Sequence, residues 1–159
     1  MKKNIAFICV HNSCRSQIAE ALGKLYLGKN FNCYSAGTEV KEKINQDAVR
    51  LMKKLYKIDM EKNGQYSKLM NQIPKADILI SMGCEVSCPY TEKPFDDNWN
   101  LEDPTGKTDA VFENVIKQIE KKILEMKYSY QNKNSPNTGE SKNGKSEIRT
   151  RDRVTPIRP

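Results

Sequence analysis

The chain has 159 residues, of which only 37% are apolar, and it contains a single histidine. No apolar run approaches the roughly 20 residues that a membrane-spanning helix needs, so we expect no membrane segment. The run Ile5 to Val10 follows two lysines but is too short for the apolar part of a secretory signal, and no small-residue cleavage site follows it. These absences predict a cytoplasmic protein. Thiols stay reduced in that compartment, so the five cysteines indicate catalysis or metal binding rather than structural disulfides.

Composition and charge divide the chain at residue 128. Residues 129–159 contain seven basic and three acidic side chains, which give a net +4 of the chain's +7, and only four apolar residues. Such a segment buries too little surface to offset the entropy lost on ordering. We therefore predict one domain over residues 1–128 and a basic, disordered tail over 129–159. The alternative is an arm that binds nucleic acid or a membrane surface. It is disfavoured because aromatic residues do not alternate with the basic ones.

Within residues 1–128, short apolar runs alternate with helical periodicity. The pattern predicts strands over 5–10, 31–35 and 77–82 and near Trp99, and helices over 16–29, from 45 to about 55, over 67–73 and over 107–127. This alternation predicts an α/β fold in three layers, with a small parallel sheet of four strands flanked by helices. We expect a monomer.

One loop carries the strongest chemical signal. Cys9 ends the first predicted strand, and Arg15 and Ser16 open the following helix. The backbone amides of the intervening residues can wrap around a tetrahedral oxyanion at the helix N-terminus. We predict that this loop binds the substrate through Val10, His11, Asn12, Ser13, Cys14 and Arg15. Arg15 can hold two oxygens, while the positive field favours a nucleophilic thiolate at Cys9, to which Ser16 can donate a hydrogen bond.

The run from Cys9 to Glu20, CVHNSCRSQIAE, resembles the signature of low-molecular-weight protein tyrosine phosphatases and of the arsenate reductases that share their fold. Further matches follow in the family order over residues 3–127: Ser35-Ala36-Gly37-Thr38, Ile58-Asp59, Asp77 to Ser81 and Asp103-Pro104. The likeness is strongest to the thioredoxin-coupled arsenate reductases. The phosphatases usually have two aromatic residues after the Asp-Pro pair, where this chain has Thr105-Gly106.

The resemblance implies that the loop binds arsenate or phosphate and that Asp103 is the acid that protonates the leaving oxygen. We expect negative charge near the oxyanion pocket to raise the pKa of Asp103. The resemblance also implies a thiol relay: Cys9 forms an adduct with arsenate, Cys84 attacks Cys9 and releases arsenite, and Cys88 attacks Cys84. Thioredoxin then reduces the Cys84–Cys88 disulfide. Only three residues separate this pair, but Cα atoms four positions apart in a helical turn are about 6 Å apart, which permits the bond.

Two other interpretations of Cys84 and Cys88 remain open. They could be unrelated buried thiols, or half of a zinc site for which only His11, Cys14 and Cys33 are left as ligands. We expect Cys33 to be a core thiol and His11 to be a loop residue without a chemical role. Cys14 could protect the nucleophile from overoxidation through a reversible disulfide.

The reductases that the chain resembles use positions equivalent to Asn12, Glu20 and Ser35 to help hold a monovalent cation. We accordingly expect a K⁺ or Na⁺ site there and no tightly bound cofactor. The fourth expected position falls in residues 59–67, where this chain has an insertion. The resemblance thus predicts an arsenate reductase. The alternative is a phosphatase that hydrolyses phosphotyrosine or other phosphoesters with the same nucleophile, arginine and acid.

Overall fold

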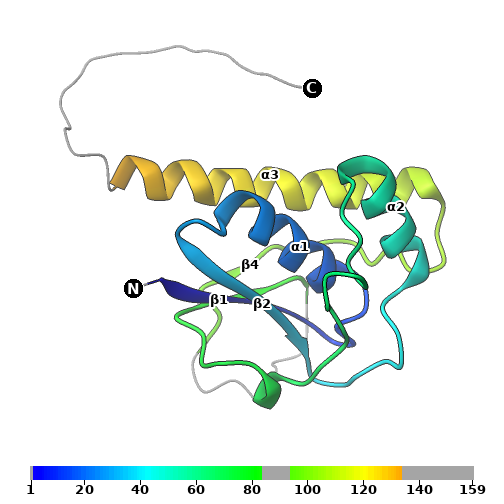
Figure 1. Cartoon of the computed structure of the whole chain (residues 1–159), viewed down its shortest axis with the longest axis horizontal. Coiled ribbons are helices and arrows are strands. Elements are labelled where there is room, and N and C mark those ends of the chain that lie inside the picture. Colours follow the sequence, from blue (N-terminus) through cyan, green and yellow to red (C-terminus); the bar gives the residue numbers. More distant parts are fainter. Residues whose placement is uncertain (1, 84–93, 134–159) are drawn as a thin grey trace, which may run out of the picture. The chain divides into compact units, whose positions relative to one another are not determined.

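A computed structural model describes residues 2–83 and 94–133 (Figure 1). The predicted relay cysteines, Cys84 and Cys88, lie outside the described residues, as does most of the predicted tail. The chain divides into two compact units, Met1–Lys127 and Tyr128–Pro159. The sheet and the candidate site belong to the first unit. Of the second unit, only the end of one helix is described.

The predicted four-stranded parallel sheet is confirmed. Its strands are β1 (Lys3–Cys9), β2 (Phe31–Gly37), β3 (Ile78–Ser81) and β4 (Asp97–Asn98), in the order β2-β1-β3-β4. All three pairs are parallel, with Cys9 opposite Gly37 and Ile8 opposite Ser81. The last residues of β1 and β2 therefore meet at one edge of the sheet, the edge at which open α/β sheets bind ligands.

Three helices lie on one side of this sheet: α1 (Arg15–Leu27), α2 (Gln46–Tyr56) and α3 (Asp109–Lys133) (Figure 1). Helix α1 packs so closely on the strands that a Cβ atom at Gly23 would come within 2.9 Å of the Cys33 sulfur. The hydroxyls of Tyr26 and Tyr56 donate hydrogen bonds to the Glu120 carboxylate, at 2.5 and 2.9 Å. This one carboxylate therefore joins α3 to both shorter helices.

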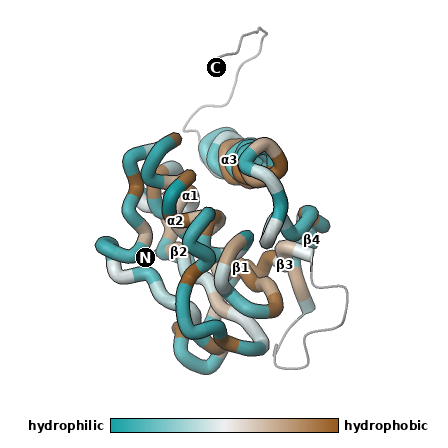
Figure 2. Tube along the Cα trace, turned by 90° about the vertical axis from the view of Figure 1, so that its right-hand side faces the viewer, coloured by the Kyte–Doolittle hydropathy of each residue, from teal (hydrophilic) through white to brown (hydrophobic). Residues whose placement is uncertain are grey.

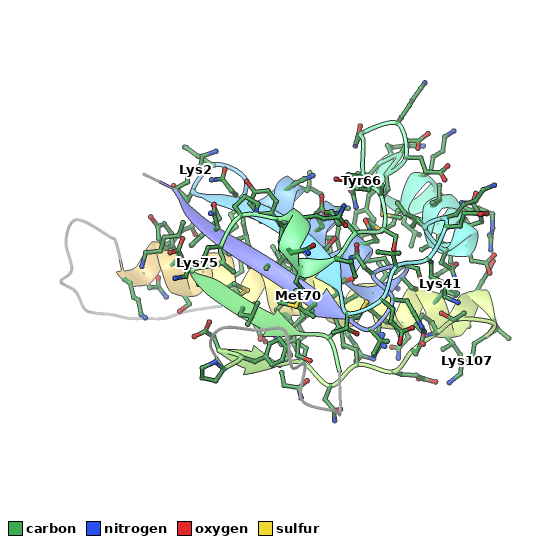
Figure 3. The ribbon with its side chains drawn as sticks, turned by 90° about the horizontal axis from the view of Figure 1, so that it is seen from below. Lys2, Lys41, Tyr66, Met70, Lys75 and Lys107 are labelled. Atoms are coloured by element: carbon green, nitrogen blue, oxygen red, sulfur yellow. The ribbon has the colours of Figure 1, made fainter. Side chains whose placement is uncertain are left out.

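Among the described residues, no α-helix covers the other face of the sheet. Its buried cluster packs against partly buried residues that include Met70, which lies over the strands in Figure 3. In Figure 2, the brown colour of hydrophobic residues marks parts of β1 and β3. The helix predicted over 67–73 is only the 3-10 turn η1 (Met70–Gln72). The reason is that residues 68 and 69 pair with β2: the Gly37 amide donates to the Lys68 carbonyl at 2.9 Å, and Gly37 forms a bridge with Leu69.

Helix α3 is longer than predicted. It continues to Lys133, so residues 129–133, which composition assigned to the disordered tail, are helical. Its fully buried residues end at Ile123, and Met126 is only half-buried. The apolar periodicity therefore indicates how far the helix is buried and not where the helix ends. Residues 129–133 contain no proline to interrupt a helix, since the next proline in the sequence is Pro136. Among the described residues, no helix combines the length and the apolar character needed to cross a membrane.

Candidate active site

The predicted nucleophile lies where β1 meets the anion loop, which we define as residues 9–15. Cys9 is buried, and its sulfur is 2.8 Å from the Ser16 hydroxyl in the first turn of α1. The structure thus brings together the Cys9 thiol and the Ser16 hydroxyl, as the sequence analysis predicted.

The amides of the anion loop are available for a ligand. Within residues 2–83 and 94–133, no acceptor is hydrogen-bonded to the backbone N–H groups of residues 11–14. The loop carbonyls, in contrast, are bonded. The Val10 carbonyl accepts from the amides of Thr38 and Glu39, and the Ser13 carbonyl accepts from Asn45 at 2.7 Å. The loop is therefore fixed through its acceptors while consecutive donors stay unpaired next to a helix N-terminus, an arrangement suited to an oxyanion.

Asn12 organises the loop from inside. It is fully buried and has a φ of 51°, in the left-handed region. Its side-chain oxygen accepts from the Lys68 amide and from Gln17, both at 2.9 Å, and its Nδ2 donates to the Ser16 hydroxyl at 2.8 Å. The Ser16 oxygen accepts from Asn12, and its own proton can be donated to Cys9, where it would stabilise a thiolate.

This hydrogen bond leads to a first prediction. Ser16→Ala should slow alkylation of Cys9 by iodoacetamide at pH 6 about tenfold, because one hydrogen bond to a charged group contributes about 1.5 kcal/mol. Peptide mass spectrometry after timed alkylation measures the rate. The Ser13 side chain makes no hydrogen bond to a described residue, so Ser13→Ala is a matched control that should stay within about twofold of the wild type. An unchanged rate in Ser16→Ala would contradict the role of Ser16.

Arg15 connects the anion loop to the segments after β3 and β4. Its Nη1 donates to the Leu101 carbonyl at 2.9 Å and to the Met82 carbonyl at 3.4 Å, while its Nη2 lies 4.0 Å from the Asp103 carboxylate. The guanidinium packs closely here, since a Cβ atom at Gly83 would be 2.9 Å from Nη1. A guanidinium has five N–H donors, so these contacts leave others for an oxyanion.

The predicted acid is near this arginine, but its pKa shifts in the opposite direction to the prediction. Burial acts to raise the pKa of Asp103, but the hydroxyl and amide of Thr105 both donate to its Oδ1, at 2.7 and 3.1 Å. Together with the charges of Arg15 and His11, these bonds hold the pKa of Asp103 below its ordinary value. The predicted rise is therefore wrong for the protein's own groups. The negative charge of a bound oxyanion would act to raise this pKa again.

The only histidine of the chain, His11, lies in the anion loop. His11 is half-exposed, and its Nε2 is 3.2 Å from the Glu39 carboxylate.

Cys14 and Cys33 are buried and free. Burial and the nearby Asp103 and Cys9 raise the pKa of Cys14, and burial with Glu20 raises the pKa of Cys33 to about 12. The protective disulfide of Cys14 stays a prediction, and the raised pKa opposes it because exchange requires a thiolate.

The three residues predicted to hold a monovalent cation lie together, but their oxygens are already bonded. Glu20 Oε1 accepts from the Ser35 hydroxyl at 2.5 Å and from Lys68 Nζ at 3.4 Å, and Oε2 accepts from Lys24 at 2.6 Å. The Asn12 side-chain oxygen accepts two hydrogen bonds. The part of the chain that the structure describes also contains no cluster of three or more acidic, histidine or cysteine side chains able to hold a metal. The side-chain oxygens of Asn12, Glu20 and Ser35 are therefore not available as ligands for a K⁺ or Na⁺ ion.

Sequence reasoning missed the segment that supports the anion loop, residues 65–68. The Gln65 side chain donates to the Gln17 side chain at 2.8 Å, and Gln17 donates to the Tyr66 carbonyl at 2.9 Å. The Ser67 hydroxyl donates to the His11 carbonyl at 2.9 Å. The only signal in the sequence was an insertion at residues 59–67, and a polar insertion by itself indicates a surface loop.

Comparison with known proteins agrees with this geometry. The model of the low molecular weight phosphotyrosine protein phosphatase family matches residues 4–135. The chain belongs to this family.

Several proteins similar to this chain are arsenate reductases. One from Bacillus cereus (strain AH187) is 38% identical over 129 residues, which cover 77% of this chain and 92% of the relative. Arsenate reductase 1 from Staphylococcus haemolyticus (strain JCSC1435) is 35% identical over 134 residues, 79% and 96% of the two chains. A solved arsenate reductase in the phosphate binding state superposes with a TM-score of 0.68 at 33% identity, covering 81% of this chain and 98% of that one.

Proposed function

We propose that this protein reduces arsenate to arsenite, with Cys9 as the nucleophile. The observation that carries the proposal is the position of the Cys9 sulfur, 2.8 Å from Ser16 and at the start of a loop with four amides that make no hydrogen bond to a described residue. Arsenate is a tetrahedral oxyanion and would accept hydrogen bonds from those amides and from Arg15. The names of the relatives and the phosphate-bound solved structure support this substrate class.

The proposed chemistry begins at the Cys9 thiolate. It attacks arsenate, an S–As bond forms, and one arsenate oxygen leaves as water after taking up protons, one of them from Asp103. The charge of the bound oxyanion must first overcome the bonds from Thr105 that favour the Asp103 carboxylate. The Cys84 thiolate then attacks the Cys9 sulfur. The S–As bond breaks with its electron pair on arsenic, which leaves as arsenite, and two thiols have become one Cys9–Cys84 disulfide.

The relay proposed for the remaining steps ends at thioredoxin. Cys88 attacks Cys84 and frees the Cys9 thiolate, and the dithiol of thioredoxin reduces the Cys84–Cys88 disulfide. The sequence position of the pair after β3, and the position of Cys9 at the end of the adjacent strand β1, support this proposal.

A cysteine substitution tests the reductase and its relay. Incubation of the wild type with arsenate, thioredoxin, thioredoxin reductase and NADPH should oxidise NADPH, and Cys84→Ser should lower turnover at least 1,000-fold, on the order of the loss when one member of a catalytic unit is removed. Cys84→Ser should keep hydrolysis of para-nitrophenyl phosphate within about twofold, because phosphate transfer needs no second thiol. Absence of arsenate turnover in the wild type would overturn the reductase, and equal loss of both activities in Cys84→Ser would overturn the relay.

Phosphoester hydrolysis is the second candidate, and the family itself favours it. The lowered pKa of Asp103 suits a carboxylate that activates water against a phosphocysteine. Thr105 and Gly106 stand where the phosphatases usually have aromatic residues that would stack on a phosphotyrosine ring. We therefore propose small phosphoesters, rather than phosphotyrosine, as substrates of any such activity.

A further inference from the structure

Next to the anion loop, two opposite charges are almost completely buried. Lys68 Nζ lies 3.4 Å from Glu20 Oε1, and the two side chains are 8% and 5% exposed. Lysine and glutamate are rarely buried to this degree unless they are paired, because removing each charge from water costs several kcal/mol. Lys24 reaches the other oxygen of the same carboxylate at 2.6 Å, but its side chain is 50% exposed. Glu20 therefore has one buried and one solvated cationic partner.

The ammonium group of Lys68 has the surroundings of a bound cation. Besides Glu20, it donates to the Tyr66 carbonyl at 3.0 Å and lies 4.9 Å from the centre of the Tyr66 ring (labelled in Figure 3). The Ser35 hydroxyl donates to the same Glu20 oxygen. A carboxylate, a carbonyl and an aromatic face are all groups that stabilise a monovalent positive charge.

The backbone of Lys68 connects this charge to the anion loop. Its amide donates to the Asn12 side-chain oxygen at 2.9 Å, and its carbonyl accepts from the Gly37 amide at 2.9 Å. Asn12 in turn donates to Ser16, which bonds to Cys9. A displacement of Lys68 would therefore move Asn12, and with it the loop amides and the hydroxyl that stabilises the thiolate.

We propose that the Lys68 ammonium is an internal monovalent cation that fixes the anion loop, so that Lys68 is a positioning residue and the site needs no bound K⁺ or Na⁺. The inference concerns oxyanion binding and the reactivity of Cys9, and it holds whether the reaction is arsenate reduction or phosphate hydrolysis. Burial lowers the pKa of Lys68 while Glu20 acts to raise it, and a burial cost of this kind is consistent with a function for the charge.

Two substitutions separate the charge of Lys68 from its packing. Lys68→Ala leaves space beside Glu20 in which K⁺ or NH₄⁺, ions of similar size, can bind. Lys68→Met fills that space with an apolar chain of similar length. Phosphate affinity is measured by the protection that phosphate gives Cys9 against iodoacetamide, read from the Cys9 peptide. Each protein is assayed in KCl, NH₄Cl and choline chloride at equal ionic strength, because choline is too large for the space.

The wild type should bind phosphate equally, within about twofold, in all three salts. In choline, both variants should bind phosphate about tenfold more weakly, the effect of losing roughly one charge-assisted contact. KCl or NH₄Cl should restore Lys68→Ala to within about threefold of the wild type and leave Lys68→Met unrestored. Lys24→Ala is the matched control, since it removes a cation from the same carboxylate on its solvated side. It should show no difference between salts.

Several outcomes would overturn the proposal. A wild type whose phosphate affinity depends on K⁺ would show that the site uses a bound metal cation. An unchanged affinity of Lys68→Ala in choline would show that Lys68 does not position the loop. A loss that KCl and NH₄Cl leave unrepaired in Lys68→Ala would show that Lys68 acts through packing alone. If neither variant folds, the salt dependence of the wild type decides: independence supports the internal cation, and dependence on K⁺ refutes it.

Discussion

Cys9→Ser should abolish arsenate reduction, with a loss of at least 10,000-fold in kcat, while phosphate still binds. A serine hydroxyl is a much weaker nucleophile than a thiolate, and it cannot form the disulfide through which electrons reach arsenic. The binding groups that we propose, the backbone amides of residues 11–14 and the Arg15 guanidinium, do not include the sulfur. Affinity and turnover should therefore separate in this variant.

Isothermal titration calorimetry with phosphate and the coupled NADPH assay measure the two properties of Cys9→Ser. The dissociation constant should stay within about threefold of the wild type, or tighten if removing a negative sulfur relieves repulsion of the anion. A variant that still reduces arsenate would place the nucleophile elsewhere. A variant that is folded but binds no phosphate would contradict the assignment of binding to the loop amides.

Sequence reasoning succeeded where local pattern and local structure coincide. Strand β1, the anion loop and α1 are contiguous, so an apolar run, a cysteine-to-arginine spacing and a helical period are enough to predict that Cys9, Ser16 and the loop amides meet. The helix predicted from residue 45 likewise begins there, since the Asn45 side chain caps α2 by accepting from the amides of residues 47 and 48. Each of these features depends on neighbours within one or two turns.

The predictions that failed depend on contacts that are distant in the sequence or on hydrogen bonds whose geometry the sequence does not specify. Lys68 reaches Glu20 across 48 positions, and composition gives no reason to expect a buried lysine. The short helix over 67–73 was lost because the backbone of residues 68 and 69 pairs with β2 instead. The pKa of Asp103 is lowered, and not raised as predicted, because Thr105 donates hydrogen bonds back to the Asp103 carboxylate. These bonds come from the residue that replaces the usual aromatic one, so the departure from the family pattern was visible, but its electrostatic effect was not.

The close approach of β2 to the anion loop gives the second large expected effect. A Cβ atom at Gly37 would lie 2.6 Å from the Val10 carbonyl oxygen and 2.9 Å from both the Asn12 amide nitrogen and the Cys9 carbonyl oxygen. All three are backbone atoms, so no side-chain rotation can relieve the contact. In Gly37→Ala the loop must move, and overpacking of this kind costs about 1–3 kcal/mol in the free energy of unfolding.

The movement in Gly37→Ala should harm binding as well as stability, because the Asn12 amide is one of the donors that no described residue accepts from. We expect phosphate affinity to fall about 100-fold, which corresponds to the loss of about two good hydrogen bonds to an anion, and the melting temperature to fall by roughly 5–15 °C. Gly64→Ala is the control. Gly64 has a φ of 87° with nothing within 4 Å of its Cβ position, so that variant carries backbone strain without steric contact. It should lose about 1 kcal/mol of stability and no phosphate affinity. If Gly37→Ala bound phosphate like the wild type, the loop amides would not be held by this contact, and β2 would act only as a strand of the core.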